Sequence, residues 1–141
     1  MSNKLNGKIE GGKKLGLLIL LFTFGEAALS KLIGAKVPDW FLAQFAGSLL
    51  DLGGPSLAAS FWMIALLETL TSAALIASLV KSKYEEHALL LAQFTFFALM
   101  IGQRLTHKYD AAFQLFAYSF LVFLFMAVNE LAAARSSKST L

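Results

Sequence analysis

Residues 57–80 read LAASFWMIALLETLTSAALIASLV, a stretch long enough and apolar enough to cross a bilayer as one helix. A spanning helix needs about 20 mostly apolar residues. The one ionisable residue in the stretch is Glu68, near its middle. A carboxylate at that depth is expensive to bury, so Glu68 predicts a functional site and a chemical partner for the carboxylate.

Three further apolar segments cover residues 15–33, 88–103 and 111–129. The chain has 141 residues, of which 57% are hydrophobic and only 15% charged, a balance typical of membrane proteins. The segment over residues 88–103 is short for a span, and Arg104 directly after it can extend it by snorkelling. We therefore predict an all-α integral membrane four-helix bundle over residues 15–129, with flanking segments 1–14 and 130–141.

The connection between the first two spans has the pattern of a short amphipathic helix. Pro38 suits a helix start, and Gly53-Gly54-Pro55 suits a stop. Between them an apolar face consists of Trp40, Phe41, Phe45 and Leu49. The pattern predicts an interfacial helix over residues 39–51 on the outer leaflet, with a short re-entrant plug as the alternative.

Basic residues predict the orientation of the bundle. Eight Lys and Arg residues lie on the side of the two termini and the second loop, and four lie on the other side. Both termini should therefore be cytoplasmic. The net charge of +3 is explained by this bias and does not predict nucleic-acid binding. The first apolar run contains Glu26 and lacks a clear cleavage site, which favours a retained first helix over a cleaved signal peptide.

Catalysis by this chain alone is not predicted. The sequence has no Cys, and its two histidines, His87 and His107, lie at opposite ends of the third span, too far apart to share a metal within it. It also has no nucleophile motif or nucleotide-binding loop. A redox role would need a bound molecule or a partner chain.

Polar residues are expected to gather in the outward half of the bundle. Helix rise places Glu26 roughly 10 Å and Glu68 roughly 16 Å below the outer surface. Thr71 and Ser72 share a face with Glu68 and could hydrogen-bond it. The candidate ligand or proton-site residues are Glu68, Glu26, Lys31, Arg104, His107, Tyr118 and Gln114.

Two questions about these residues stay open. Lys31 follows Glu26 by five positions, a poor spacing for an ion pair within one helix, so either Lys31 or Arg104 could reach Glu68. Whether the two glutamates are ionised depends on that pairing. The competing interpretation is that the polar side chains merely join helices or reach solvent at helix ends.

Short motifs resemble those of the DoxX-like family of small four-helix bacterial membrane proteins. They are Phe24-Gly25-(x5)-Lys31-Leu32, Ala65-Leu66-Leu67-Glu68, a third helix ending near His107, and Phe116-Ala117-Tyr118-Ser119-Phe120. The resemblance covers about residues 15–129. Glu26 departs from it, because that position is usually apolar in the family.

The resemblance implies an accessory or anchor subunit of a redox-linked complex in the bacterial inner (cytoplasmic) membrane. It also implies other membrane subunits and lipids as partners. No covalent cofactor is expected, and quinone or lipid is the candidate bound molecule. The alternatives are a purely structural subunit of a larger assembly and a small proton-coupled carrier.

Overall fold

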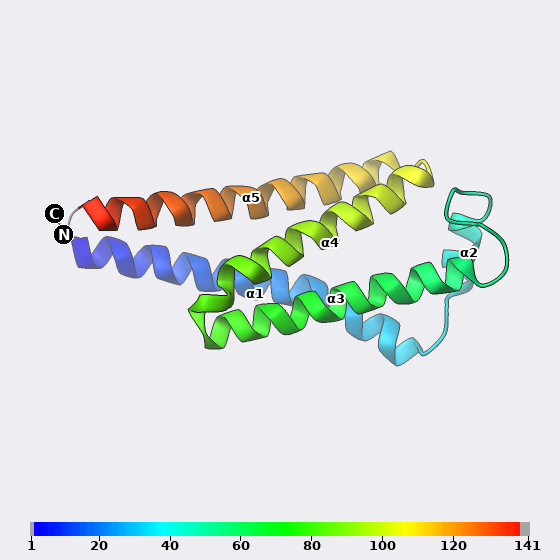
Figure 1. Ribbon diagram of the computed structural model, residues 1–141, viewed down its shortest axis with the longest axis horizontal. Helices are drawn as coiled ribbons and strands as arrows, with labels where there is room; N and C mark the ends of the chain where they lie inside the picture. The colour runs from blue at the N-terminus through cyan, green and yellow to red at the C-terminus, as the bar shows by residue number, and fades with distance from the viewer. Residues whose placement is uncertain (1, 139–141) are drawn as a thin grey trace.

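The computed structural model describes residues 2–138 as a set of long helices (Figure 1). In chain order they are α1 (Ser2–Gly34), α2 (Asp39–Phe45), α3 (Ser56–Val80), η1 (Ser82–Tyr84, a 3₁₀ turn), α4 (Glu85–Leu105) and α5 (Tyr109–Lys138). No strand occurs in this range. The predicted all-α class is confirmed.

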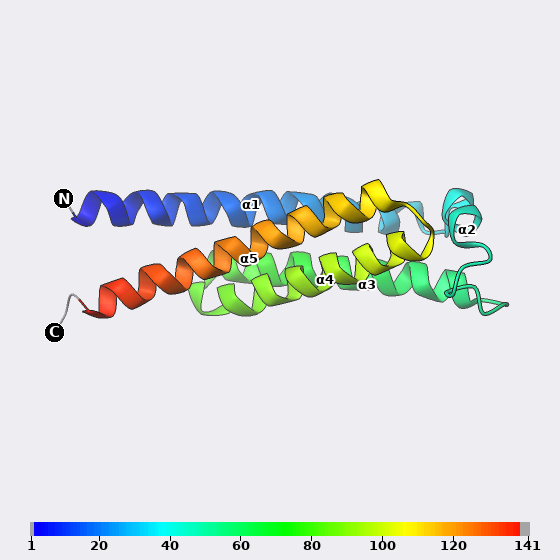
Figure 2. The same ribbon diagram turned by 90° about the horizontal axis from the view of Figure 1, so that it is seen from above.

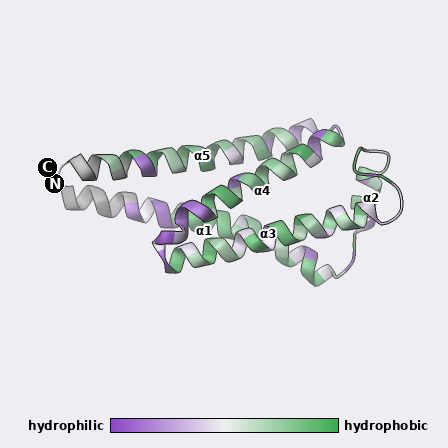
Figure 3. Cartoon of the chain, viewed as in Figure 1, coloured by the Kyte–Doolittle hydropathy of each residue, from purple (hydrophilic) through white to green (hydrophobic). Residues whose placement is uncertain are grey.

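Four helical segments of the described chain are each long and apolar enough to cross a membrane. They are Glu10–Gly34, Ser56–Val80, Ser82–Leu105 and Tyr109–Leu131. The long helices alternate in direction, so the start of α1 and the end of α5 lie at one end of the bundle and α2 lies at the other (Figures 1 and 2). Figure 3 shows the expected distribution of hydropathy, with largely hydrophobic rods and hydrophilic residues gathered near η1 and at the α4–α5 turn.

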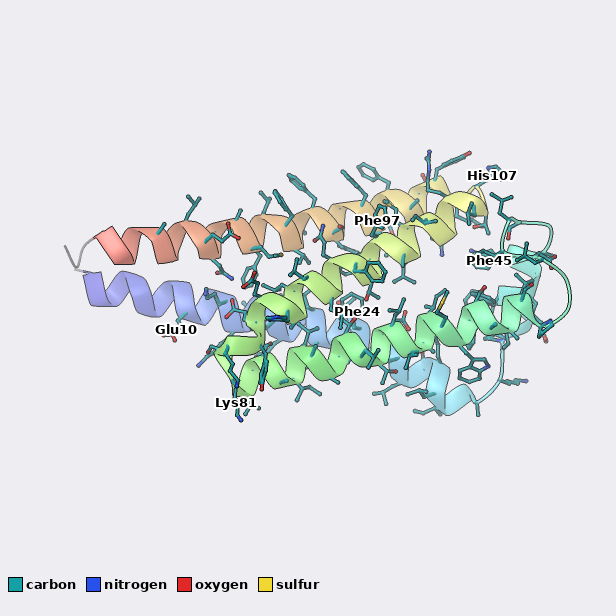
Figure 4. The ribbon with its side chains drawn as sticks, in the orientation of Figure 1. Glu10, Phe24, Phe45, Lys81, Phe97 and His107 are labelled. Carbon is teal, nitrogen blue, oxygen red and sulfur yellow. The ribbon has the colours of Figure 1, made fainter. Side chains whose placement is uncertain are left out.

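The helices pack in a series, α1 on α3, α3 on α4, and α4 on α5. The central core is apolar and includes Phe24, Leu75, Leu89 and Phe96, all at most 2% exposed. Figure 4 shows Phe24 at the middle of the bundle. Many large apolar side chains, such as Phe22 and Phe113, instead point outward, as expected for surfaces that contact lipid acyl chains.

The outer helices are longer than the apolar segments predicted. The flanks assigned to residues 1–14 and 130–141 are largely helical, because α1 begins at Ser2 and α5 runs to Lys138. Lys13 in the first extension and Asn129, the residue before the second, both contact Glu85 at the start of α4. Residues 1 and 139–141, and the side chains of Lys4, Lys8, Arg135 and Lys138 used for the orientation, lie outside what the structure describes.

The interfacial helix predicted over residues 39–51 is wrong in length, since α2 ends at Phe45. Gly47 adopts a left-handed φ of +70°, and the Asp51 carboxylate accepts a hydrogen bond from its N–H at 2.9 Å. Both features favour a turn over another helical turn. Leu49, placed on the apolar face by the prediction, is therefore exposed.

One face of the short helix α2 packs against the other helices. Phe41 and Phe45 are buried against the start of α3, with the Phe41 and Phe61 rings 5.1 Å apart. The Gln44 amide donates to Gln103 of α4 at 3.1 Å. Helix α2 thus lies over the start of α3 and the end of α4. Trp40 of α2 remains exposed.

Candidate functional site

A buried ion pair joins α1 to α3. The Lys31 ammonium lies 2.8 Å from Oε2 of Glu68 and donates a hydrogen bond to its Oε1 at 3.0 Å. The Glu68 side chain is 3% exposed and that of Lys31 is 19% exposed. The prediction that Glu68 faces the interior is confirmed, and of its two possible basic partners it is Lys31 that reaches it.

The position of this pair follows from the offset between the two helices. Glu68 lies twelve residues from each end of α3, roughly 18 Å from either end. Lys31 is in the last turn of α1, and α1 ends short of the end of the bundle at which α2 lies (Figure 1). The offset therefore brings Lys31 at the end of α1 beside Glu68 in the middle of α3.

The neighbouring hydroxyl groups of α3 do not hydrogen-bond the Glu68 carboxylate. The Ser72 hydroxyl donates to the Glu68 main-chain oxygen at 2.8 Å, and Thr71 lies 2.8 Å from the Thr95 hydroxyl of α4. The expected hydrogen bonds from Thr71 and Ser72 to the carboxylate are therefore wrong. Within the described chain, buried Oε2 accepts no hydrogen bond of good geometry. Among the residues that the structure describes, Lys31 is the one cation paired with this carboxylate.

Glu26 has the opposite environment from Glu68. It is exposed, and it makes no hydrogen bond or ion pair with the described residues. It borders a groove of about 800 Å³ between α1 and α3, together with Ser72, Ala73 and Ile76, which follow Glu68 toward η1. The last turn of α1 lies level with the middle of α3. Glu26, five residues before Lys31, therefore lies farther from the outer surface than the sequence predicts.

Arg104 and His107 form a separate cluster at the α4–α5 turn. The Arg104 guanidinium lies 4.8 Å from the centre of the Tyr109 ring, and Nδ1 of His107 lies 3.0 Å from the Tyr109 hydroxyl. His107 has a left-handed φ of +58° in this turn (Figure 4). The cluster is at the end of the bundle, roughly 15–20 Å along its axis from Glu68, so the single pocket predicted for these residues is wrong.

Tyr118 and Gln114 lie on the exposed side of α5. Tyr118 is 48% exposed, and its ring contacts Phe96 with 5.9 Å between centroids. It lines a cavity of about 460 Å³ between α1 and α5, whose α1 wall includes Ile19 and Thr23. Neither Tyr118 nor Gln114 makes a hydrogen bond to another described residue, Glu68 included.

The sequence interpretation missed two polar connections between helices. Glu85 at the start of α4 contacts Lys13 of α1 at 3.4 Å and accepts a hydrogen bond from Asn129 of α5 at 2.7 Å. Gln93 of α4 donates to Ser119 of α5 at 2.8 Å. Charges at helix starts and isolated polar residues in spans were the available signals, and neither identifies the partner.

The chemistry available at the Lys31–Glu68 site is that of charge and protons. A desolvated carboxylate–ammonium pair can exchange a proton or bind a polar group of a ligand. No group of three or more His, Cys, Asp or Glu residues among the described residues is arranged to hold a metal ion. No protein-family model, curated protein or solved structure was found to match this chain.

Proposed function

We propose that this chain is an accessory or anchor subunit of a redox-linked complex in the bacterial inner membrane, with both termini cytoplasmic. The proposal takes Lys31 and Glu68 as its functional centre. The redox class and the membrane come from the sequence resemblance to DoxX-like proteins, and the orientation comes from the distribution of basic residues. Quinone or lipid is the proposed bound molecule.

One observation carries the proposal: the Lys31–Glu68 pair is kept inside an otherwise apolar part of the bundle. Removing two charges from water offsets most of their mutual attraction, and apolar residues of similar size are often as stable or more stable. Stability alone therefore does not account for the pair. A charge or proton site used by the assembled complex does account for it.

The test begins with purification of the tagged chain from its native membrane in a mild detergent. We expect a stoichiometric membrane partner with the absorbance of a flavin, haem or iron–sulfur group. The double variant Lys31→Met/Glu68→Leu should insert normally, while the reductant-driven electron transfer of the complex is lost.

Three results would contradict the proposal. A partner without redox cofactors would favour a purely structural subunit. Proton or solute movement by the chain alone in sealed vesicles would favour a carrier. Unchanged electron transfer in Lys31→Met/Glu68→Leu, at normal membrane abundance, would remove the pair from the mechanism.

A further inference from the structure

The groove of about 800 Å³ between α1 and α3 is open to the bilayer and lined mostly by apolar side chains. Phe22, Leu29 and Ile76 line it, and the side chain of each is more than half exposed. Smaller residues, Gly25 and Ala73, line it as well, and a Cβ added at Gly25 would meet nothing within 4 Å. Small residues on a helix surface let another membrane helix approach closely. The groove therefore has room for a further helix beside α1 and α3.

Glu26 is the one charged residue that lines this groove among the described residues. The main-chain oxygen of the next residue, Ala27, accepts a hydrogen bond from the Lys31 ammonium at 3.3 Å. The same ammonium lies 2.8 Å from Oε2 of Glu68, in the middle of α3. Glu26 is thus within one helical turn, roughly 5 Å, of the level of the ion pair. A carboxylate at this depth borders hydrocarbon and not water.

The charges at this level of the bundle do not balance. Two carboxylates, those of Glu26 and Glu68, lie near one ammonium, that of Lys31, and the ammonium is paired with Glu68. Glu26 is exposed and makes no hydrogen bond or ion pair with a described residue. One carboxylate at the groove is therefore left without a cation, and a positively charged group in the groove would neutralise it.

The depth of Glu26 favours a protein helix over a lipid as the occupant. Lipid headgroups lie roughly 15 Å from the midplane, beyond the hydrocarbon, and acyl chains carry no cation. A spanning helix can hold a Lys or Arg at mid-depth, where such residues face protein and pair with an opposite charge. The groove also follows α1 over residues 21–32, roughly 16 Å, as contact with a rod-shaped partner requires.

A second copy of this chain does not supply the cation. Within the four apolar stretches, residues 15–33, 57–80, 88–103 and 111–129, the sequence has one basic residue, Lys31. That lysine is already paired with Glu68. The helix that complements the groove therefore belongs to a different protein.

We propose that the groove between α1 and α3 binds one spanning helix of a partner protein, and that a Lys or Arg near the middle of that helix pairs with Glu26. The helix packs on the small residues Gly25 and Ala73. The inference rests on the proposed function in one respect, that this chain is a subunit with a membrane partner. It does not depend on the redox class or on the role of Lys31 and Glu68.

Photocross-linking in native membranes tests the occupant. Photoreactive benzoylphenylalanine replaces Leu29 in the groove or, as the control, Phe113, which is exposed on α5. We expect a discrete protein adduct from position 29 only, with the captured segment a spanning helix that has Lys or Arg near its middle. Adding Glu26→Gln should lower the yield on the order of 10-fold. Adducts with lipid only, with a second copy, or with a span that lacks a basic residue would overturn the proposal.

Synthetic helices of Leu and Ala with either Arg or Leu at the centre test the chemistry. Energy transfer from the labelled chain in phosphatidylcholine vesicles measures their binding. The central-Arg helix should bind on the order of 10-fold more tightly than the central-Leu helix. This preference should be lost in Glu26→Gln and kept in Glu86→Gln, at an exposed carboxylate of α4. No preference in the natural chain, or the same preference in Glu26→Gln, would refute the pairing.

Filling the groove tests the site separately from the charge. Gly25→Leu should weaken the binding of both synthetic helices, whereas Gly12→Leu, near the start of α1, should not, although neither added Cβ meets another atom within 4 Å. Unchanged binding in folded Gly25→Leu would place the helix elsewhere. None of these measurements uses electron transfer, so a partner without redox cofactors would contradict the proposed function and leave this inference standing.

Discussion

Two neighbouring ionisable residues of α1, Lys31 and Glu26, have opposite environments. On the α3 side the helices pack closely, and Lys31 reaches across to a buried Glu68. Five residues earlier, Glu26 is exposed at the border of the groove between α1 and α3 and makes no hydrogen bond or ion pair with a described residue. One helix therefore carries both a satisfied polar contact and an unsatisfied one.

The difference shows which contacts this fold completes by itself. A polar group inside the bundle must find its partner in the same chain, and Glu68 does so through the offset of α1. A polar group on the bilayer-facing surface has no such neighbour, and hydrocarbon does not solvate it. Glu26 thus has no hydrogen-bonding or ionic partner among the described residues, whereas Glu68 has one in Lys31.

The largest expected loss of stability comes from Lys31→Met, which removes the cation of the ion pair between α1 and α3. The substitution leaves the Glu68 carboxylate buried without its cation, and loss of one member of a buried pair costs about 3–5 kcal/mol. Unfolding of the purified protein by sodium dodecyl sulfate measures the loss. Lys36→Met, at an exposed lysine in the connection after α1, is the control. Equal stability of the two variants would mean that Lys31 does not neutralise Glu68 in the folded protein.

A smaller effect is expected from Gly16→Leu on the α5 side. A Cβ at Gly16 would lie 3.1 Å from the Phe125 ring of α5, so a larger side chain forces the helices apart. Overpacking of this kind costs about 1–3 kcal/mol. At Gly25 an added Cβ meets nothing within 4 Å, so Gly25→Leu is the matched control. If both variants unfold at the same detergent concentration, Phe125 does not rest on α1 as described.

The smallest effect is expected from Thr71→Val, which removes the hydrogen bond between the Thr71 and Thr95 hydroxyls. Thr95 keeps its bond to the Leu91 oxygen, and interhelical hydrogen bonds in membranes average about 0.6 kcal/mol. Thr69→Val is the control, because the Thr69 hydroxyl bonds only its own helix, at Ala65. A loss of several kcal/mol in Thr71→Val would show that this contact holds α3 on α4 far more strongly than we infer.

Much of the fold was predictable from the sequence. Uninterrupted apolar stretches specify spanning helices, and the interior place of Glu68 follows from the cost of exposing it to lipid. The end of α2 was not predictable from the apolar pattern alone, because Leu49 continues that pattern while Gly47 takes a left-handed backbone.

The candidate site was only partly predictable. Helix rise gives depth along one helix, but not the offset between helices that brings Lys31 to Glu68 and sets Glu26 deeper than expected. Arg104 and His107 were grouped with Glu68 by their side of the membrane. The turn beyond α4 instead holds them against Tyr109. Pairing between helices depends on packing, which spacing within one helix does not specify.

The most direct test of the account is a double-mutant cycle on Lys31→Met and Glu68→Leu, with stability and electron transfer of the complex measured for each variant. The account predicts that the double variant is within about 1 kcal/mol of the parent in stability, because an apolar pair can replace a buried ion pair. It also predicts that this stable variant no longer supports electron transfer. Additive destabilisation would show that the two residues do not act as a pair, and full electron transfer in the double variant would show that the pair is not the functional centre.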